Sequence, residues 1–337
     1  MPRWATTAEI ARQAGVSRAT VDRVINGRAG VHPRTVKLVT EISQAMRSGN
    51  QKRPAATKSA PRFQLAFVLP TNANSFLQSL ADEVPALMED DWTYNLVRSA
   101  SFQAADVVAA LNCVPESVAG LVVVAPDVPV VQEALRRFRE AGKPIIALAS
   151  PFVGADAYVG TNNRAAGRIA AQLISRFVRL EGGTVGLMRG LLSYRGQEER
   201  EMGFRAVLDQ EAPGLKVAVL ERSQSKDDSA ERQVLDAVSH LPTLCGIYSM
   251  AGNNSEIAAA LVAAGRTDIV LIGHDLTPGT RASLLSGVMD AAIVQSPIDE
   301  IRQATKTLTA MVRDPTFRSM PPLEHLPIHI VIRESLS

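Results

Sequence analysis

From Phe63 onward, short apolar runs alternate with longer segments whose apolar positions recur at helical spacing. Near-continuous Val, Ile and Leu runs bounded by helices are typical of parallel strands covered on both faces. Strands are expected at 63–69, 94–98, 120–125, 144–149, 184–188, 215–220, 244–249, 268–273, 291–295 and 328–332. Helices are expected at 130–141, 164–177, 198–208, 229–240 and 256–264. Because so many strands exceed one comfortable open sheet, the pattern predicts an α/β fold with two doubly wound parallel-sheet lobes.

The first 46 residues carry only short helical patterns. Thr6 followed by Glu9 is a capping box, which predicts a helix start. Gly15 is suited to end that helix, and Ser17 is expected to cap the next. A third helix is expected from His32-Pro33. Two short helices at a tight glycine turn predict a helix-turn-helix. The expected inward-facing residues are Val21, Val24, Ile25, Val36, Val39 and Ile42.

A stretch without apolar periodicity separates these two patterns. It contains glycine, two prolines and several basic residues, which are typical of a flexible, phosphate-attracted linker. The sequence therefore predicts three parts: a DNA-binding head at 1–46, a linker at 47–62, and a two-lobed body at 63–337.

Charge is distributed unevenly between these parts. Residues 1–62 hold twelve Lys or Arg and three Asp or Glu, a net charge of +9. The remaining residues hold 24 basic and 31 acidic side chains, a net charge of −7. A basic head gains affinity for a phosphate backbone through counterion release. The charge pattern thus supports double-stranded DNA as a partner of the head.

Composition indicates which broad class of protein this chain belongs to. A 46% hydrophobic content fits a globular protein, and no apolar run reaches the length of a membrane span. No signal-peptide pattern precedes the head, so a cytoplasmic protein without membrane association is expected. Cys113 and Cys245 are expected to be inert core thiols, and no metal site or cofactor is expected.

Several polar or aromatic residues follow directly after predicted strands. Ligands of open parallel sheets bind beyond the carboxyl ends of the strands. Amides, carboxylates, arginines and an aromatic ring suit a hydroxyl-rich ligand. If Arg189, Arg195 and Arg200 all face the cleft, an anionic sugar acid or sugar phosphate is favoured. The strand-end residues are Asn72, Asn74, Phe76, Asp127, Ser150, Asn162, Asn163, Arg189, Tyr194, Arg195, Arg200, Asn253, Asp275 and Gln295.

These motifs together resemble the lactose-repressor (LacI/GalR) family of bacterial transcription regulators. The segment 6–26, followed by Val-His-Pro-Arg-Thr at 31–35, is close to that family's head signature. The body resembles its periplasmic-binding-protein-like effector domain at 159–167, where Asn162 replaces the usual Asp, and at 200–204 and 272–275. The resemblance implies a homodimer, or a higher oligomer, that binds operator DNA under control of a small ligand.

Carried over to this chain, the resemblance implies roles for eight head residues. Arg18 and Ala19 match the pair that reads base edges, and Arg18 would favour guanine. Asp22, where a serine is usual, either accepts from a cytosine or pairs with Arg18 on the same helix, and we favour the helix pair. The implied DNA-binding set is Thr6, Ser17, Arg18, Ala19, Thr20, Asp22, Arg23 and Asn26.

The linker departs from the family pattern. Family members place a short hinge helix with a minor-groove leucine there, whereas this chain has Pro54 inside the corresponding stretch and Thr57 near the leucine position. Proline costs about 3 kcal/mol in a helix interior. We therefore expect an extended linker with Lys52, Arg53 and Lys58 as phosphate contacts.

The leading functional hypothesis is a transcription regulator, expected to be a repressor, whose effector is a sugar, sugar acid, sugar phosphate or polyol. A solute-binding protein and a sugar-active enzyme, each carrying a DNA-binding head, are the alternatives. No catalytic motif is present, and adjacent His274 and Asp275 should point to opposite faces of a strand. The proposed ligand-binding set is Asn74, Phe76, Asp127, Asn162, Arg195, Arg200, Asn253, Asp275 and Gln295.

Overall fold

The chain forms two compact units, Met1–Ala60 and Pro61–Ser337. The computed structural model describes residues 6–26, 28, 31–47, 63–72, 74–87, 92–179, 182–190, 195–220, 229–250, 252–319 and 325–336. The expected extended linker, with Lys52, Arg53, Pro54, Thr57 and Lys58, lies outside the described residues.

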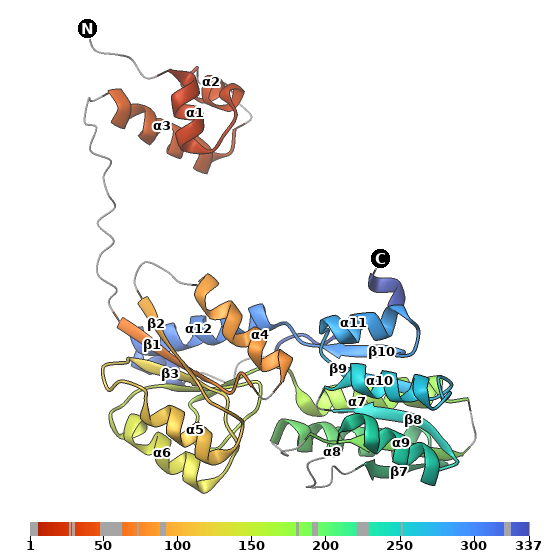
Figure 1. Ribbon diagram of the computed structural model, residues 1–337. Helices are drawn as coiled ribbons and strands as arrows, with labels where there is room; N and C mark the ends of the chain where they lie inside the picture. The colour runs from red at the N-terminus through yellow and green to blue at the C-terminus, as the bar shows by residue number, and fades with distance from the viewer. Residues whose placement is uncertain are drawn as a thin grey trace. The chain divides into compact units, whose positions relative to one another are not determined.

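The head consists of three helices, drawn in red in Figure 1. They are α1 (Thr7–Ala14), α2 (Arg18–Ile25) and α3 (Pro33–Arg47). Gly15, at φ +64°, makes the turn between the first two. The core holds Ile10, Ala11, Val21 and Val39, with Ala14, Val16, Val24 and Ile42 packed against it.

Two predicted core residues of the head are instead exposed. Ile25 is 41% exposed and Val36 is 38% exposed. Ile25 is the last residue of α2, and Val36 lies in the first turns of α3. Helices this short cover one another only over their central turns, so helical periodicity overestimates burial near their ends.

The first lobe of the body is built on a parallel sheet of order β2-β1-β3-β4-β5. Helices α4 (Ser75–Glu83) and α12 (Pro297–Arg313) cover one face, with the short 3₁₀ helix η1 (Val84–Leu87). Helices α5 (Ala104–Asn112) and α6 (Pro129–Glu140) cover the other (Figure 1). The strands are β1 (Phe63–Leu69), β2 (Trp92–Arg98), β3 (Gly120–Val123), β4 (Ile145–Leu148) and β5 (Ala157–Val159).

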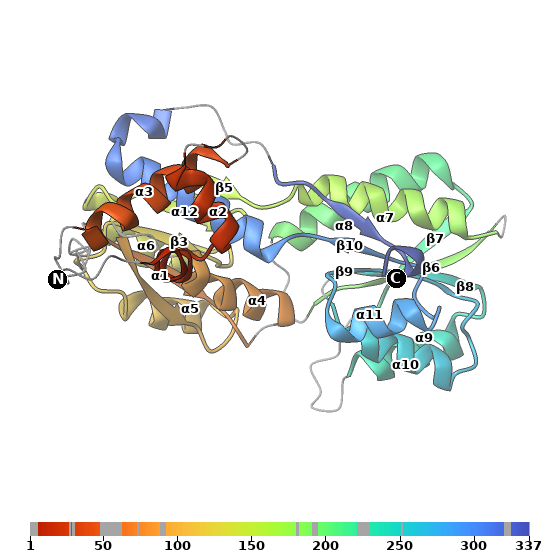
Figure 2. The same ribbon diagram turned by 90° about the horizontal axis from the view of Figure 1, so that it is seen from above.

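The second lobe is built on a sheet of order β11-β10-β9-β8-β6-β7. Helices α7 (Asn163–Phe177) and α8 (Arg195–Glu211) cover one face. Helices α9 (Ala230–His240), α10 (Asn254–Ala263) and α11 (Pro278–Leu285) cover the other (Figure 2). The strands are β6 (Gly183–Met188), β7 (Leu215–Leu220), β8 (Leu244–Ser249), β9 (Val270–His274), β10 (Ala291–Val294) and β11 (His329–Val331).

The chain passes between the two lobes three times. It crosses after β5 into α7, from β10 into α12, and from α12 back to β11. Two crossings run side by side, because Thr161 forms a parallel bridge with Leu326 and the Leu326 amide donates to the Gly160 carbonyl. Residues at these crossings therefore contact both lobes.

The predicted α/β class with two lobes is confirmed, and each predicted strand is found with small shifts at its ends. The pattern missed β5, whose three residues make too short an apolar run. One expectation of parallel pairing is wrong, since β11 runs antiparallel to β10. Cys113 was expected in the core but is exposed after the end of α5, whereas Cys245 is buried. None of the described helices is long and apolar enough to cross a membrane.

Candidate functional site

The second helix of the head presents a polar, basic surface. Ser17 caps α2, because its hydroxyl accepts from the Thr20 amide at 3.1 Å and lies 2.8 Å from the Thr20 hydroxyl. Val21 faces the core, so Arg18, Ala19 and Arg23 lie exposed on the opposite side. Exposed guanidinium groups on a helix after a helix-turn-helix turn can bind guanine edges and phosphates.

Asp22 does not make the predicted pair with Arg18. Its carboxylate accepts from the Asn26 side-chain amide at 2.9 Å and lies 3.5 Å from a guanidinium nitrogen of Arg28. The Asn26 amide also donates to the Asp22 carbonyl, which closes the end of α2. Spacing along the helix favoured Arg18, but Arg28 comes back toward Asp22 after the helix ends. Arg18 therefore remains available for another partner.

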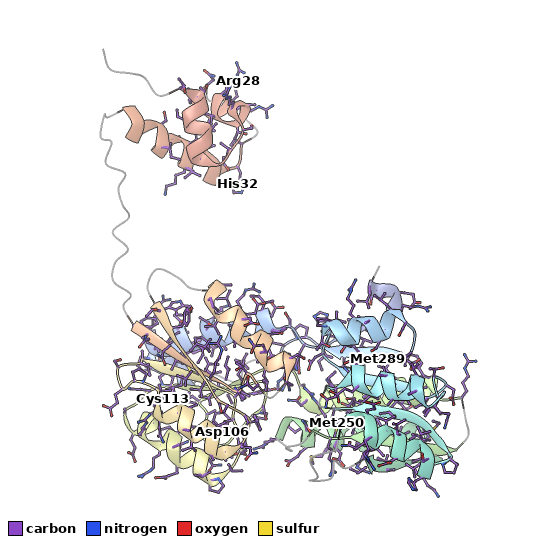
Figure 3. The ribbon with its side chains drawn as sticks, in the orientation of Figure 1. Arg28, His32, Asp106, Cys113, Met250 and Met289 are labelled. Atoms are coloured by element: carbon purple, nitrogen blue, oxygen red, sulfur yellow. The ribbon has the colours of Figure 1, made fainter. Side chains whose placement is uncertain are left out.

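A groove of about 460 Å³ lies beside this surface. It is bounded by the turn before α2, by α2 itself and by the start of α3. Thr6 lies exposed before α1. Figure 3 marks Arg28 and His32 on this unit. The lining residues are Val16, Ser17, Ala19, Thr20, Arg23, Val31, His32 and Thr35.

Arg200 is the buried centre of the body's candidate site, with only 4% of its surface exposed. Its Nε donates to the side-chain oxygen of Asn163 at 2.8 Å, and Nη1 donates to the Met250 carbonyl at 2.8 Å. Met250, marked in Figure 3, directly follows β8. Asn163 in turn lies within hydrogen-bond distance of the Ala149 carbonyl and the Tyr158 hydroxyl in the first lobe.

Two glycines allow α7 and α8 to approach closely enough for this arrangement. A Cβ at Gly167 would overlap the carbonyl oxygen of Arg200, and a Cβ at Gly203 would overlap that of Arg164. The two helices thus cross with backbone against backbone. Gly167 and Gly203 therefore hold α8, and Arg200 with it, close against α7.

Asp275 and Gln295 lie together at the crossings. The Gln295 amide donates to the Asp275 carboxylate at 3.1 Å, and the Thr161 hydroxyl donates to the Gln295 side-chain oxygen at 3.3 Å. Asp275 adopts a left-handed φ of +65°, just beyond β9. Such strain in a non-glycine residue is common at ligand sites. Burial raises the pKa of Asp275, although the charge of Arg200 and the Gln295 bond act in the opposite direction.

The start of α8 bridges the lobes at a second point. Nη1 of Arg195 lies 3.1 Å from the Asp127 carboxylate, and the Gly196 amide donates to the buried Ser150 hydroxyl at 3.2 Å. Burial opposes ionisation of Asp127, but bonds from the Val153 amide, Gln132 and Arg195 outweigh it and lower the pKa. Asp127 is therefore a carboxylate engaged by protein groups.

Arg189 is engaged away from the Arg200 centre. It forms a two-pronged pair with Glu201 at 2.7 and 2.8 Å, and Arg205 joins the same carboxylate. Burial opposes ionisation of Glu201, while Arg189 and Arg205 lower its pKa. Of the three arginines that suggested an anionic ligand, two are thus paired with carboxylates.

Other predicted site residues have structural roles. Asn74 caps α4 by accepting from the Leu77 amide, and Asn162 caps α7 by accepting from the Ala165 amide. Phe76, proposed as a ligand-binding residue, is buried in the first-lobe core. Asn253 is exposed in a left-handed conformation before α10. Tyr194 lies outside the described residues.

Sequence reasoning missed two buried polar features. The Tyr248 hydroxyl lies 2.7 Å from Nε2 of His274, and burial lowers the pKa of His274 well below its usual value. The second is Glu300 on α12, which carries no motif signal. Because His274 bonds Tyr248 and Asp275 bonds Gln295, the two neighbours form no dyad. Within the described ranges, no cluster of three His, Cys, Asp or Glu side chains could hold a metal ion.

Comparison with known proteins finds a match for the head and another for the body. Residues 6–49 match the bacterial regulatory proteins of the lacI family, and residues 65–315 match the periplasmic binding protein domain. The chain is 26% identical over 269 residues to the ribose import binding protein RbsB of Salmonella typhimurium, which covers 77% of this chain and 87% of that protein.

Two further relatives are regulators by name. The chain is 29% identical over 149 residues to catabolite control protein A of Priestia megaterium, covering 43% of each. A solved structure of a LacI transcriptional regulator from Bacteroides fragilis superposes with a TM-score of 0.72 at 20% identity, covering 82% of this chain and 98% of that one. The chain thus joins a lacI-family head at residues 6–49 to a body at 65–315 that belongs to the periplasmic binding protein domain family, and it is a DNA-binding transcription regulator.

Proposed function

We propose that this regulator binds a pseudo-palindromic operator as a homodimer and that a small carbohydrate-like ligand, held between the two lobes of the body, controls its operator affinity. We propose the division into a head at 1–46, a linker at 47–62 and a body at 63–337. Of the ligand-binding set predicted from the sequence, Arg200, Asp275 and Gln295 are the principal ligand contacts. Asn162 and Asn74 position neighbouring helices.

The observation that carries this proposal is the polar network at the crossings. Arg200, Asn163, Thr161, Asp275 and Gln295 come from different elements, and their bonds connect the lobes. A polyol presents several donors and acceptors at once, so it can exchange hydrogen bonds with each of them. Binding would then change how the lobes contact one another, which is the differential interaction that an allosteric ligand needs.

The surface of α2 supports the DNA part of the proposal. Arg18, Ala19 and Arg23 are exposed side by side, and Ser17 and Thr20 lie at the helix start, where a phosphate oxygen is favoured. A single head of this size offers few contacts, so a dimer reading two half-sites would supply the affinity. Repression is the expected mode, because a bound dimer on an operator blocks other proteins from the same DNA.

A solute-binding role is the second candidate. The similarity to a ribose import binding protein favours capture of a pentose or a related sugar by the body. The lacI-family head favours regulation instead, since a transport protein gains nothing from a DNA-binding unit. Both candidates place a sugar in the same site, so the ligand test precedes the DNA test.

The experiment is a thermal-unfolding screen of the full chain against D-ribose, other pentoses, hexoses and cyclitols. A ligand at a hundred times its Kd stabilises by about 2.7 kcal/mol, which raises Tm measurably. We expect the shift to disappear in Asp275→Asn. It should persist in Asp268→Asn, where an exposed carboxylate pairs only with nearby Arg266. Equal shifts in both variants would contradict the assignment of the site.

A further inference from the structure

Glu300 is a fully buried carboxyl group that finds no hydrogen-bond partner among the described residues. It lies in the first turns of α12, directly after the crossing from β10, with 0% of its surface exposed. In the part of the chain that the structure describes, neither Oε1 nor Oε2 makes a hydrogen bond. Burying a polar group without a partner destabilises the folded protein, so such a group calls for an explanation.

Glu300 lies close along the chain to the crossing between the lobes, because its helix begins directly after Gln295, which bonds Asp275 and Thr161. Glu300 belongs to a helix packed on the first lobe, yet the charges that act on it are Asp275 and Arg200 of the second. Burial and Asp275 raise the pKa of Glu300 well above its usual value, and Arg200 opposes them. Glu300 is therefore near the two residues on which the proposed ligand site is centred.

The charges at this site do not suit an anion. Arg189 is paired with Glu201, and Arg195 with Asp127. Among the described residues at the centre, the remaining charged or acidic groups are one guanidinium, Arg200, and two carboxyls, Asp275 and Glu300. An acidic ligand would add a negative charge beside these two buried carboxyls and would compete with them for the single guanidinium.

We infer that Glu300 contacts the ligand and that it selects a polyol carrying an amino group, such as an amino sugar or aminocyclitol, over the corresponding acid. This inference rests on the proposed ligand site between the lobes. An ammonium group brings three donors and one positive charge, which satisfy the two idle carboxyl oxygens and neutralise Glu300 on ionisation. The hydroxyls remain for Arg200, Asp275 and Gln295. Since Glu300 is fully buried beside the crossing, the ligand reaches it as the lobes part.

The neighbouring Asp299 provides a matched control. It lies in the same helical turn, also has a carboxyl side chain, and pairs on the surface with Arg302 at 2.5 Å. Glu300→Gln and Asp299→Asn each replace one carboxyl group by an amide with little change of shape. A general effect of charge near the start of α12 would appear in both variants, whereas direct ligand contact changes only the first.

The test measures Kd by calorimetry at pH 7.5 for the full chain. The first series of compounds is D-galactose, D-galactosamine and D-galacturonate. The second is D-glucose with its amino and acid forms. One of the two series, galactose or glucose, is expected to bind. In the wild type and in Asp299→Asn, the amino compound of that series should bind with an affinity about tenfold higher than its parent sugar, the effect of one charge-assisted hydrogen bond. The acid should bind most weakly. In Glu300→Gln the amino and parent compounds should become equal within about twofold, because the charge is gone.

Two results would overturn the inference while leaving the proposed function intact. One is tighter binding of an acid than of its parent sugar, and the other is an unchanged amino-to-parent ratio in Glu300→Gln. If none of the six compounds binds, the amino and parent forms of the sugar or cyclitol found in the wider screen are compared in the same way, and a ratio below about twofold overturns the inference. Failure of the whole screen would reject the carbohydrate class itself, and the inference with it. Circular dichroism of each variant confirms that it is folded before binding is compared.

Discussion

The guanidinium of Arg200 donates to the side chain of Asn163 at 2.8 Å, and this bond joins α8 to the first residue of α7. Asn163 continues the connection to the Ala149 carbonyl just beyond β4, while Arg200 continues it to the Met250 carbonyl beyond β8. A short chain of hydrogen bonds therefore runs between the strand ends of the two lobes. A ligand that engages Arg200 alters this connection directly.

Arg200→Lys should destabilise the body by about 3 kcal/mol and remove ligand-induced stabilisation. Lysine keeps the charge, but its single ammonium cannot reproduce the planar geometry that serves Asn163 and Met250 together. Urea unfolding monitored at Tyr and Trp checks the first effect and thermal shift the second. Arg205→Lys on the same helix is the control, because its partly exposed pair with Glu201 should change stability by under about 1 kcal/mol. Similar losses in both variants would argue against a special role for Arg200.

Gly203→Ala should lower the stability of the body by about 2–3 kcal/mol, since the added Cβ overlaps the Arg164 carbonyl and forces α7 and α8 apart. The corresponding fall in Tm is roughly 5 °C or more. Gly182→Ala is the matched control: a Cβ there meets only the Gly214 carbonyl, at 3.9 Å. Differential scanning calorimetry of the full chain compares the two, and an unchanged Tm in Gly203→Ala would show that the helices do not pack as described.

Glu300 should make the stability of the body depend on pH. Burial and Asp275 raise its pKa in the folded state above the unfolded value, so the unfolded chain loses this proton first as pH rises. Stability is then greatest below about pH 4.5 for this group and declines as pH rises toward the folded pKa. In Glu300→Gln the decline of Tm between pH 5 and pH 8 should be smaller than in the wild type. Identical pH profiles would mean that Glu300 is ionised and compensated in the folded protein.

Arg18→Ala should weaken operator binding by about 1–3 kcal/mol and relax specificity at one base pair, because Arg18 is exposed and free of the predicted bond to Asp22. Arg23→Ala should weaken binding too. If Arg23 contacts phosphate, the loss of affinity is similar for all DNA sequences, and the slope of log affinity against log salt concentration falls in magnitude by about 1. Fluorescence anisotropy on a duplex obtained by selection from a random library measures both. Arg136→Ala on the body, an exposed arginine, is the control and should leave the affinity unchanged.

Much of the fold was predictable from local pattern. The strands β1, β7 and β8 begin and end at the predicted residues, because each is a mostly apolar run that the pattern separates from its flanking segments. The strand β5 escaped because it has only three residues, of which Ala157 and Tyr158 are partly buried. Burial at the ends of the short head helices could not be read from periodicity, as the exposed Ile25 and Val36 show.

The site was predictable only in part. Strand ends and motifs located Arg200, Asp275 and Gln295, which the structure brings near one another through the crossings. Pairing partners were less predictable: Asp22 pairs with Arg28, Arg189 with Glu201, and Arg195 with Asp127, which is 68 residues away. No signal in the sequence pointed to Glu300, because acidic residues such as Asp299 and Glu300 are common in the first turn of a helix, where they interact favourably with the helix dipole. Its burial depends on how α12 packs in the folded chain, which sequence spacing does not reveal.

The most direct test of the central claim is the affinity of the full chain for its selected duplex at 0.15 M salt, measured with and without the ligand found in the thermal screen. We predict that the ligand changes this affinity at least about fivefold, within the usual range of allosteric coupling, and that Asp275→Asn binds the duplex but no longer responds. An affinity that is the same with and without a bound ligand would contradict the account, because the body would then bind its ligand without controlling the head.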